Sequence, residues 1–156
     1  MDALQQLIEK DRIARLKAAY FRLYDAQDWD AWLALFTEDA TLRAAQEVVW
    51  SRKPKAPALA LIGREAIGEY VRRMGPSRRT VHQGHTPEID LLPDGTARGI
   101  WAMEDIIEYS HKRLHGHGHY HETYRIVGGS WKFASVELRR LRLTTRDYPE
   151  SDLLDR

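Results

Sequence analysis

The hydrophobic period of this chain changes once, near Thr80. Before that point, apolar residues recur every three or four positions, as on one face of a helix, and after it they alternate with polar residues. A block of helices followed by a block of long strands is typical of an α+β fold. We therefore expect a cone-shaped barrel: a curved, mostly antiparallel sheet covered by three N-terminal helical segments, with a cavity between them.

Three helical segments are expected before the change of period. The first covers about residues 2–26, and Asp28 is suited to cap a short second helix that a charged Thr-Glu-Asp turn at 37–39 would end. The third covers residues 63–75 and stops at a Gly-Pro pair. The first helix is expected to bury one apolar stripe, made of Leu4, Leu7, Ile8, Ile13, Leu16, Tyr20 and Leu23.

The strands are expected mainly in the second half of the chain. Residues 40–46 form a candidate first strand, and residues 51–60, with two prolines and several cations, resemble an exposed excursion. Turns are expected at Pro93-Asp94-Gly95 and at Gly128-Gly129. The polar residues 145–156 are expected to fray or to dock on a neighbouring subunit, with 147–156 as a flexible tail.

Composition narrows the class of protein. A chain of 156 residues fits a single domain over 1–156, and the absence of cysteine excludes a disulfide scaffold, a thiolate zinc cluster and a cysteine nucleophile. The 24 Lys and Arg nearly balance the 23 Asp and Glu, which argues against nucleic acid as a partner. The N-terminus carries charges throughout, so we expect neither a signal peptide nor membrane association, and a cytoplasmic location.

Asp105 is the most unusual residue of the expected sheet. Alternation along residues 97–109 places it on the same face as apolar and aromatic side chains, while other acidic residues take the opposite face. A buried carboxylate needs a partner, either in a structural ion pair or in a catalytic pair with a histidine. His82 and His85 of the preceding strand are both candidates, and alternation alone does not choose because Gly84 could introduce a bulge.

Three further positions are candidates for a site. Tyr20 lies on the buried helix stripe, and Asp25 lies near the end of that helix. Each also has an ordinary interpretation, as a core tyrosine and a solvated carboxylate. On the last strand the apolar pattern shifts between Arg140 and Arg142, so a bulge decides which arginine faces inward.

The remaining motifs point to a ligand rather than to a cofactor. His117, His119 and His121 share one side of a strand and could present imidazoles to a metal, yet no function is required of them, and we expect no metal site. The chain has no glycine-rich phosphate loop, nucleophile elbow or dinucleotide fingerprint, so we expect chemistry without a cofactor. The five tryptophans suit a bulky apolar ligand or a packed core.

Several segments, taken in order, resemble a known family. They are "LKAAYFRLYDAQDWD", "HQGHTPEI", "GIWAMED" and the tryptophan after the Gly-Gly turn. Together they resemble the SnoaL-like group of the nuclear transport factor 2-like superfamily, and most closely its bile acid 7α-dehydratase branch. The resemblance implies five catalytic residues, which fall on Tyr20, Asp25, His82, Asp105 and Arg140.

The resemblance also implies a function. It implies a lyase that needs no cofactor, most simply a dehydratase, acting on a hydroxylated steroid-like, polycyclic or aromatic compound as a homotrimer or homodimer. The alternatives are a carbon–carbon lyase that releases formaldehyde from a lignin-type diaryl compound, and a non-catalytic small-molecule-binding domain. We expect His82, held by Asp105, to act as the base, with Asp25 and Arg140 orienting Tyr20 or the substrate. The expected substrate-binding residues are Trp101, Met103, His85, His119, Tyr120 and Trp50.

Overall fold

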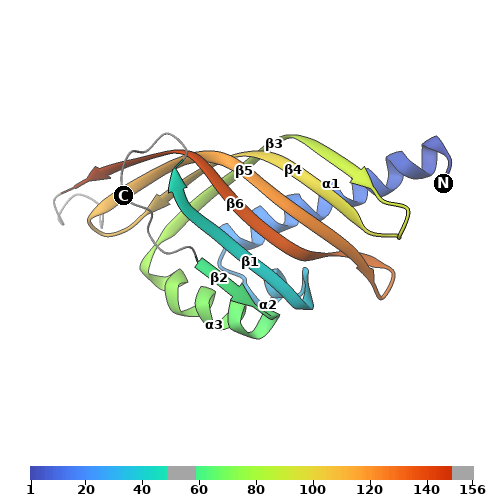
Figure 1. Ribbon diagram of the computed structural model, residues 1–156. Helices are drawn as coiled ribbons and strands as arrows, with labels where there is room; N and C mark the ends of the chain where they lie inside the picture. Colours follow the sequence, from blue (N-terminus) through green and yellow to red (C-terminus); the bar gives the residue numbers. More distant parts are fainter. Residues whose placement is uncertain (49–58, 149–156) are drawn as a thin grey trace.

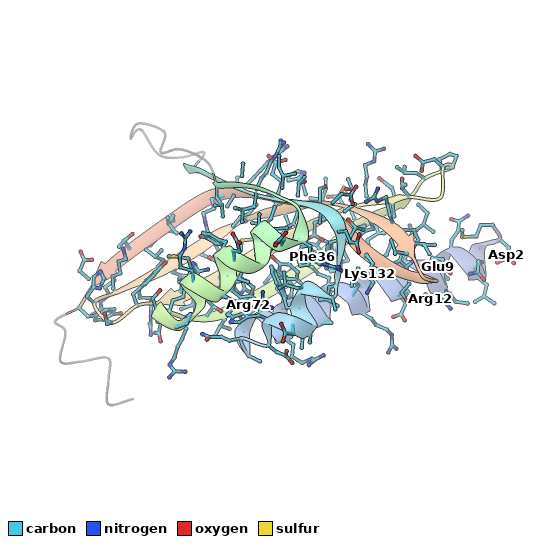
Figure 2. The ribbon with its side chains drawn as sticks, turned by 90° about the horizontal axis from the view of Figure 1, so that it is seen from below. Asp2, Glu9, Arg12, Phe36, Arg72 and Lys132 are labelled. Carbon is cyan, nitrogen blue, oxygen red and sulfur yellow. The ribbon has the colours of Figure 1, made fainter. Side chains whose placement is uncertain are left out.

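The computed structural model describes residues 1–48 and 59–148, which build one six-stranded sheet with the strand order β2-β1-β6-β5-β4-β3. The helices lie against one face of this sheet, as the two views show (Figures 1 and 2). We call this the helix-covered face and the opposite one the outer face. The elements are α1 (Ala3–Asp25), α2 (Trp29–Leu33), β1 (Phe36–Val48), β2 (Leu59–Ile62), α3 (Arg64–Met74), a 3-10 turn (Gly75–Ser77), β3 (Arg79–Leu91), β4 (Ala97–Glu108), β5 (Lys112–Val127) and β6 (Ser130–Asp147).

The predicted α+β architecture is confirmed. The β1–β6 pair is parallel, whereas β1–β2, β3–β4, β4–β5 and β5–β6 are antiparallel. Asp28 caps α2 as expected, its side chain accepting a hydrogen bond from the backbone of Ala31. The core between sheet and helices is largely aromatic, with Trp32, Phe36, Tyr124 and Phe133 almost completely buried.

The expected apolar stripe of α1 is wrong over its first two turns. Leu4 and Leu7 are 68% and 65% exposed, because the start of α1 extends beyond the ends of the strands and has no sheet to pack against (Figures 1 and 2). The buried stripe instead includes two charged residues, Glu9 and Lys17. Glu9 lies near the β5–β6 turn, where it accepts a hydrogen bond from Trp131 Nε1 at 2.8 Å.

Three expected strand boundaries are also wrong. Residues 37–39 belong to β1 rather than to a turn, because Phe36 is buried opposite Phe133 of β6 and pairing already begins there. β2 begins at Leu59, inside the expected excursion, and pairs with β1; residues 51–58 lie outside the described residues. β6 reaches Asp147, which pairs with Lys112, so residues 145–147 do not fray; the rest of the expected tail, 149–156, is outside the described residues.

Two irregularities decide which side chains face the helices. In β3 the register shifts after His85, next to a positive φ of 30° at Thr86, rather than at Gly84 as considered from the sequence. In β6, Gly118 of β5 pairs with Arg140 while His117 pairs with Arg142, so the extra residue lies between the two arginines.

Among the described residues, no helix combines the length and the apolar character that crossing a membrane requires.

Candidate active site

A cavity of about 130 Å³ lies between the helices and the sheet. Elements far apart in the sequence contribute to its wall, among them α1, α3 and the strands β3 to β6. Apolar side chains such as Val71 and Leu138 line it together with polar ones. The polar groups of the wall include Tyr20, Arg78, His82, Asp105, Tyr120 and Arg140.

His82 is fixed in this cavity by Asp25, at the C-terminal end of α1. The His82 Nδ1 and Asp25 Oδ1 atoms are 2.6 Å apart. Asp25 is itself held by the hydroxyl of Thr80 at 2.8 Å and by the backbone N–H of His82 at 2.9 Å. The His82 ring also stacks on Phe21, with an interplanar angle of 8°. A carboxylate at Nδ1 selects the tautomer in which Nδ1 carries the proton and Nε2 is free to accept another.

Asp105 is paired with Arg140, not with His82. The guanidinium donates two hydrogen bonds, 2.7 Å from Nη1 to Oδ1 and 2.5 Å from Nη2 to Oδ2. The predicted His82–Asp105 pair is therefore wrong, although these residues are directly opposite each other in the β3–β4 register. The reason is that both groups find other partners: the end of α1 brings Asp25 to His82, and the β6 bulge turns Arg140 inward. Asp25, which was expected to orient Tyr20 or the substrate, contacts His82 instead.

Glycine in β5 makes the Asp105–Arg140 pair possible. A Cβ atom on Gly116 would collide with Arg140 Nη1 and Asp105 Oδ1, and one on Gly118 would collide with the backbone of Arg139. The glycines alternate with histidines because the helix-covered face needs room for the arginine while the outer face does not. The His-Gly-His-Gly-His segment thus serves the site through its glycines.

Two tyrosine hydroxyls complete the polar wall. Tyr20 of α1 and Tyr120 of β5 both line the cavity, with their rings 6.1 Å apart. Burial raises the pKa of both phenols well above the usual value, so both stay protonated and act as hydrogen-bond donors at neutral pH. The arrangement brings together a base, a guanidinium and neutral donors, as required to remove a proton and stabilise negative charge on oxygen.

The sequence profile of the SnoaL-like domain matches residues 5–137. The chain belongs to the SnoaL-like family. Solved structures share its fold. A candidate scytalone dehydratase from Novosphingobium aromaticivorans is 25% identical, with 92% of this chain and 90% of that chain covered and a TM-score of 0.76. The type 3 hexachlorocyclohexane dehydrochlorinase of Novosphingobium barchaimii is 15% identical, with 93% and 94% covered and a TM-score of 0.74, a level of identity that shows the fold alone.

Most of the expected substrate-binding residues of this SnoaL-like chain lie away from the cavity. Of those that the structure describes, only Tyr120 lines it. Trp101 and Met103 are buried elsewhere in the core, with Trp101 Nε1 donating to Tyr124 Oη at 2.9 Å. His85 and His119 alternate onto the outer face, since their neighbours Gly84 and Tyr120 face the helices. Trp50 lies outside the described residues.

Arg78 is a cavity residue that the sequence did not predict. Its Nη2 donates to Tyr24 Oη at 2.6 Å, whereas its buried Nε has no hydrogen-bond partner within residues 1–48 and 59–148. The ionisable groups around it include Tyr24, Tyr70 and Tyr109. No carboxylate pairs with this partly buried guanidinium in the part of the chain that the structure describes, which leaves it open to an anionic or strongly polar ligand. No sequence signal marked this arginine, because it follows the third helix in an irregular segment.

A buried ion pair packs against the rings of the two cavity tyrosines. Lys17 of α1 and Glu122 of β5 are almost completely inaccessible and form a hydrogen-bonded salt bridge. The Lys17 Nζ atom lies 3.6 Å from the ring centroid of Tyr120 and 4.3 Å from that of Tyr20. Burial lowers the pKa of Lys17 to about 8, against the attraction of Glu122, which raises it. The lysine therefore remains charged at pH 7. In the sequence it was one unremarkable charge on the first helix.

Proposed function

We propose that this protein is a cofactor-independent lyase, most simply a dehydratase. The observation that carries the proposal is the His82–Asp25 pair, in which Asp25 occupies Nδ1 and His82 lines a cavity that also contains Tyr20 and Arg140. Solved structures with the same fold include a candidate scytalone dehydratase and a dehydrochlorinase, whose names denote elimination reactions. The proposed catalytic set is the one that the resemblance to the bile acid 7α-dehydratase branch implies: Tyr20, Asp25, His82, Asp105 and Arg140.

In the proposed reaction, His82 Nε2 removes a proton from a carbon next to a carbonyl or conjugated group. The electron pair of the broken C–H bond forms a C=C bond, and the C–O bond to the hydroxyl breaks. The hydroxyl leaves as water with the proton that His82 returns. Tyr20 and Arg140 donate hydrogen bonds to the oxygen that gains negative charge, while Asp105 holds Arg140 in position.

The cavity favours an aromatic substrate over a complete steroid. Its volume of about 130 Å³ is close to the roughly 150 Å³ of a cavity that holds one benzene molecule. We propose that one ring of the substrate enters the cavity, between apolar residues such as Val71 and Leu138. The hydroxylated carbon would then lie near His82.

The test is an assay of the protein, without added cofactor and with a chelator present, on aryl β-hydroxy ketones, lignin-type diaryl diols and hydroxylated steroid thioesters. We expect a new conjugated chromophore and a product lighter by one water, with aromatic substrates preferred. A product lighter by formaldehyde instead would identify a carbon–carbon lyase. Ligands that stabilise the protein against heating but are recovered unchanged from the whole panel would indicate a binding domain.

Arg78 is expected to bind an oxygen of the substrate. Arg78→Met removes a charged donor that faces the cavity, and we expect KM to rise about 10- to 100-fold, because a hydrogen bond to a charged group contributes about 1.5–3 kcal/mol. We expect kcat to change little, since His82 keeps its contacts. Steady-state kinetics with a phenolic or carboxylated substrate measure both constants. The control is Arg79→Met, at an exposed neighbouring position; equal KM values for the two variants would refute a binding role for Arg78.

A further inference from the structure

The outer face of the sheet carries a cluster of side chains that the proposed reaction does not use. Glu104 of β4 and His115 and His117 of β5 each offer one ligand atom, and these three atoms lie within 4.8 Å of one another. Alternation separates them from the cavity, because the neighbouring Asp105 and Gly116 face the helices.

We propose that Glu104, His115 and His117 form a binding site for a divalent transition-metal ion of the zinc class. Two imidazoles and one carboxylate are a recurrent ligand set for Zn²⁺, and without cysteine the site would take borderline metals rather than soft ones. Three protein ligands leave a coordination position for water. The metal would tie β4 to β5 on the face opposite the active site.

The distances suit this assignment. The His115 Nε2 atom is 2.5 Å from Glu104 Oε1, and the His117 Nε2 atom is 3.8 Å from the same oxygen. Ligand atoms about 2.0–2.1 Å from a tetrahedral zinc ion are roughly 3.4 Å apart, so these two distances bracket the required one. The three side chains are half-buried. Small side-chain rotations would bring their ligand atoms to the separation that a zinc ion requires.

The strand register explains why these three residues meet. His117 and Glu104 are direct partners in the β4–β5 ladder, and His115 follows on the same face of β5, with the two imidazole rings 4.7 Å apart. The sequence alone shows only the run of histidines; the carboxylate comes from the neighbouring strand. In addition, the buried His117 Nδ1 has no hydrogen-bond partner in the described part of the chain, so no hydrogen bond at that nitrogen fixes the orientation of the ring.

The same strand supplies a matched control. His119 and His121 continue the histidine row on the outer face, but their direct partners on β4 are Ala102 and Ile100, neither of which offers a ligand atom. On β6, Glu137 pairs with His121, but both of its carboxylate oxygens already accept hydrogen bonds from Arg139. Their ring centroids are 6.5 Å apart, farther than those of His115 and His117. If histidine content alone attracted metal, both pairs would bind equally.

The experiment is a calorimetric titration of chelator-treated, tag-free protein with Zn²⁺, followed by a titration with Co²⁺ monitored by visible absorption. We expect one saturable site per chain and the spectrum of a four-coordinate cobalt ion. The His115→Ala/His117→Ala variant and the isosteric Glu104→Gln variant are expected to bind at least about 10-fold more weakly, whereas His119→Ala/His121→Ala binds as the unaltered protein does. Circular dichroism of each variant confirms that it is folded.

Two results would overturn the proposal. One is the absence of a saturable zinc site in the unaltered protein. The other is a similar loss of affinity in the control pair and in the Glu104→Gln variant, which would indicate non-specific binding along the histidine row. Because Glu104→Gln preserves the size and shape of the side chain, weakened binding in a folded Glu104→Gln protein is evidence for direct ligation.

Discussion

His82→Gln is expected to lower kcat about 10²- to 10⁴-fold, the usual contribution of a general base, with little change in the melting temperature. Glutamine fills a similar volume, and its amide N–H can still donate to Asp25, so the contacts that hold β3 against α1 are largely kept. It cannot accept the proton. The assay is single-turnover and steady-state kinetics on the best substrate of the panel, together with thermal unfolding.

The matched control is His85→Gln, three residues further along the same strand on the outer face. It makes the same chemical change outside the cavity and is expected to leave kcat unchanged. Retention of near-normal turnover by His82→Gln would refute the assignment of the base. Equal losses in both variants would point to an effect on β3 as a whole.

The partner of His82 can be tested in the same assay. Asp25→Asn removes the charge that stabilises the imidazolium and is expected to lower kcat by about 10²-fold or more. Asp105→Asn weakens the hold on Arg140 instead and leaves the His82–Asp25 contact in place, so it is expected to lower kcat less than Asp25→Asn does. The opposite pattern would favour the pairing predicted from the sequence.

The sequence predicted which face of a strand a residue occupies better than it predicted which side chains meet. Period-two alternation along β4 correctly placed Asp105 on the buried face, because that property is local to one strand. Which group reaches Asp105 is not local. It depends on the bulge that turns Arg140 inward, and on the length of α1, which ends where Asp25 can meet His82. The apolar pattern of the last strand signals a bulge but not which arginine it turns inward, and the contact between helix and strand leaves no periodic signal.

The difference between local and non-local properties also explains why the expected substrate-binding residues differ from those that line the cavity. Residue type favours His85 and His119 as ligand-binding groups, but the parity of their strands puts them on the outer face. Trp101 has the correct parity, yet it lies in a part of the core where its indole N–H is already bound to Tyr124. Arg78 lines the cavity from a segment without regular periodicity. A strand residue thus needs the correct parity to line the cavity, and its position along the strand then decides whether it does.

Breaking the buried Lys17–Glu122 pair is expected to be the largest single-residue effect on stability. Lys17→Met leaves the Glu122 carboxylate without its cation in a fully buried position, and loss of one partner of such a pair costs about 3–5 kcal/mol. For a chain of this length, that corresponds to a fall of roughly 6–20 °C in the melting temperature. Thermal and denaturant unfolding measure the loss. Arg15→Met, which breaks an exposed ion pair with Asp11 on the same helix, is the control and is expected to change the melting temperature little.

The double variant separates the charge from the packing. Lys17→Met/Glu122→Gln removes both charges, keeps an acceptor for the Tyr124 hydroxyl and fills the space, so we expect it to recover most of the stability that Lys17→Met loses. A double variant no more stable than Lys17→Met would show that the lysine stabilises the fold through its contacts with the aromatic rings of Tyr20 and Tyr120, and not through neutralising Glu122.

Glu122→Gln alone removes the attraction that raises the pKa of Lys17. The pKa of Lys17 in the folded protein, already about 8, should then fall further below its value in the unfolded chain. Because the unfolded chain binds more protons in this range, the stability of the variant is expected to increase as the pH rises toward about 10.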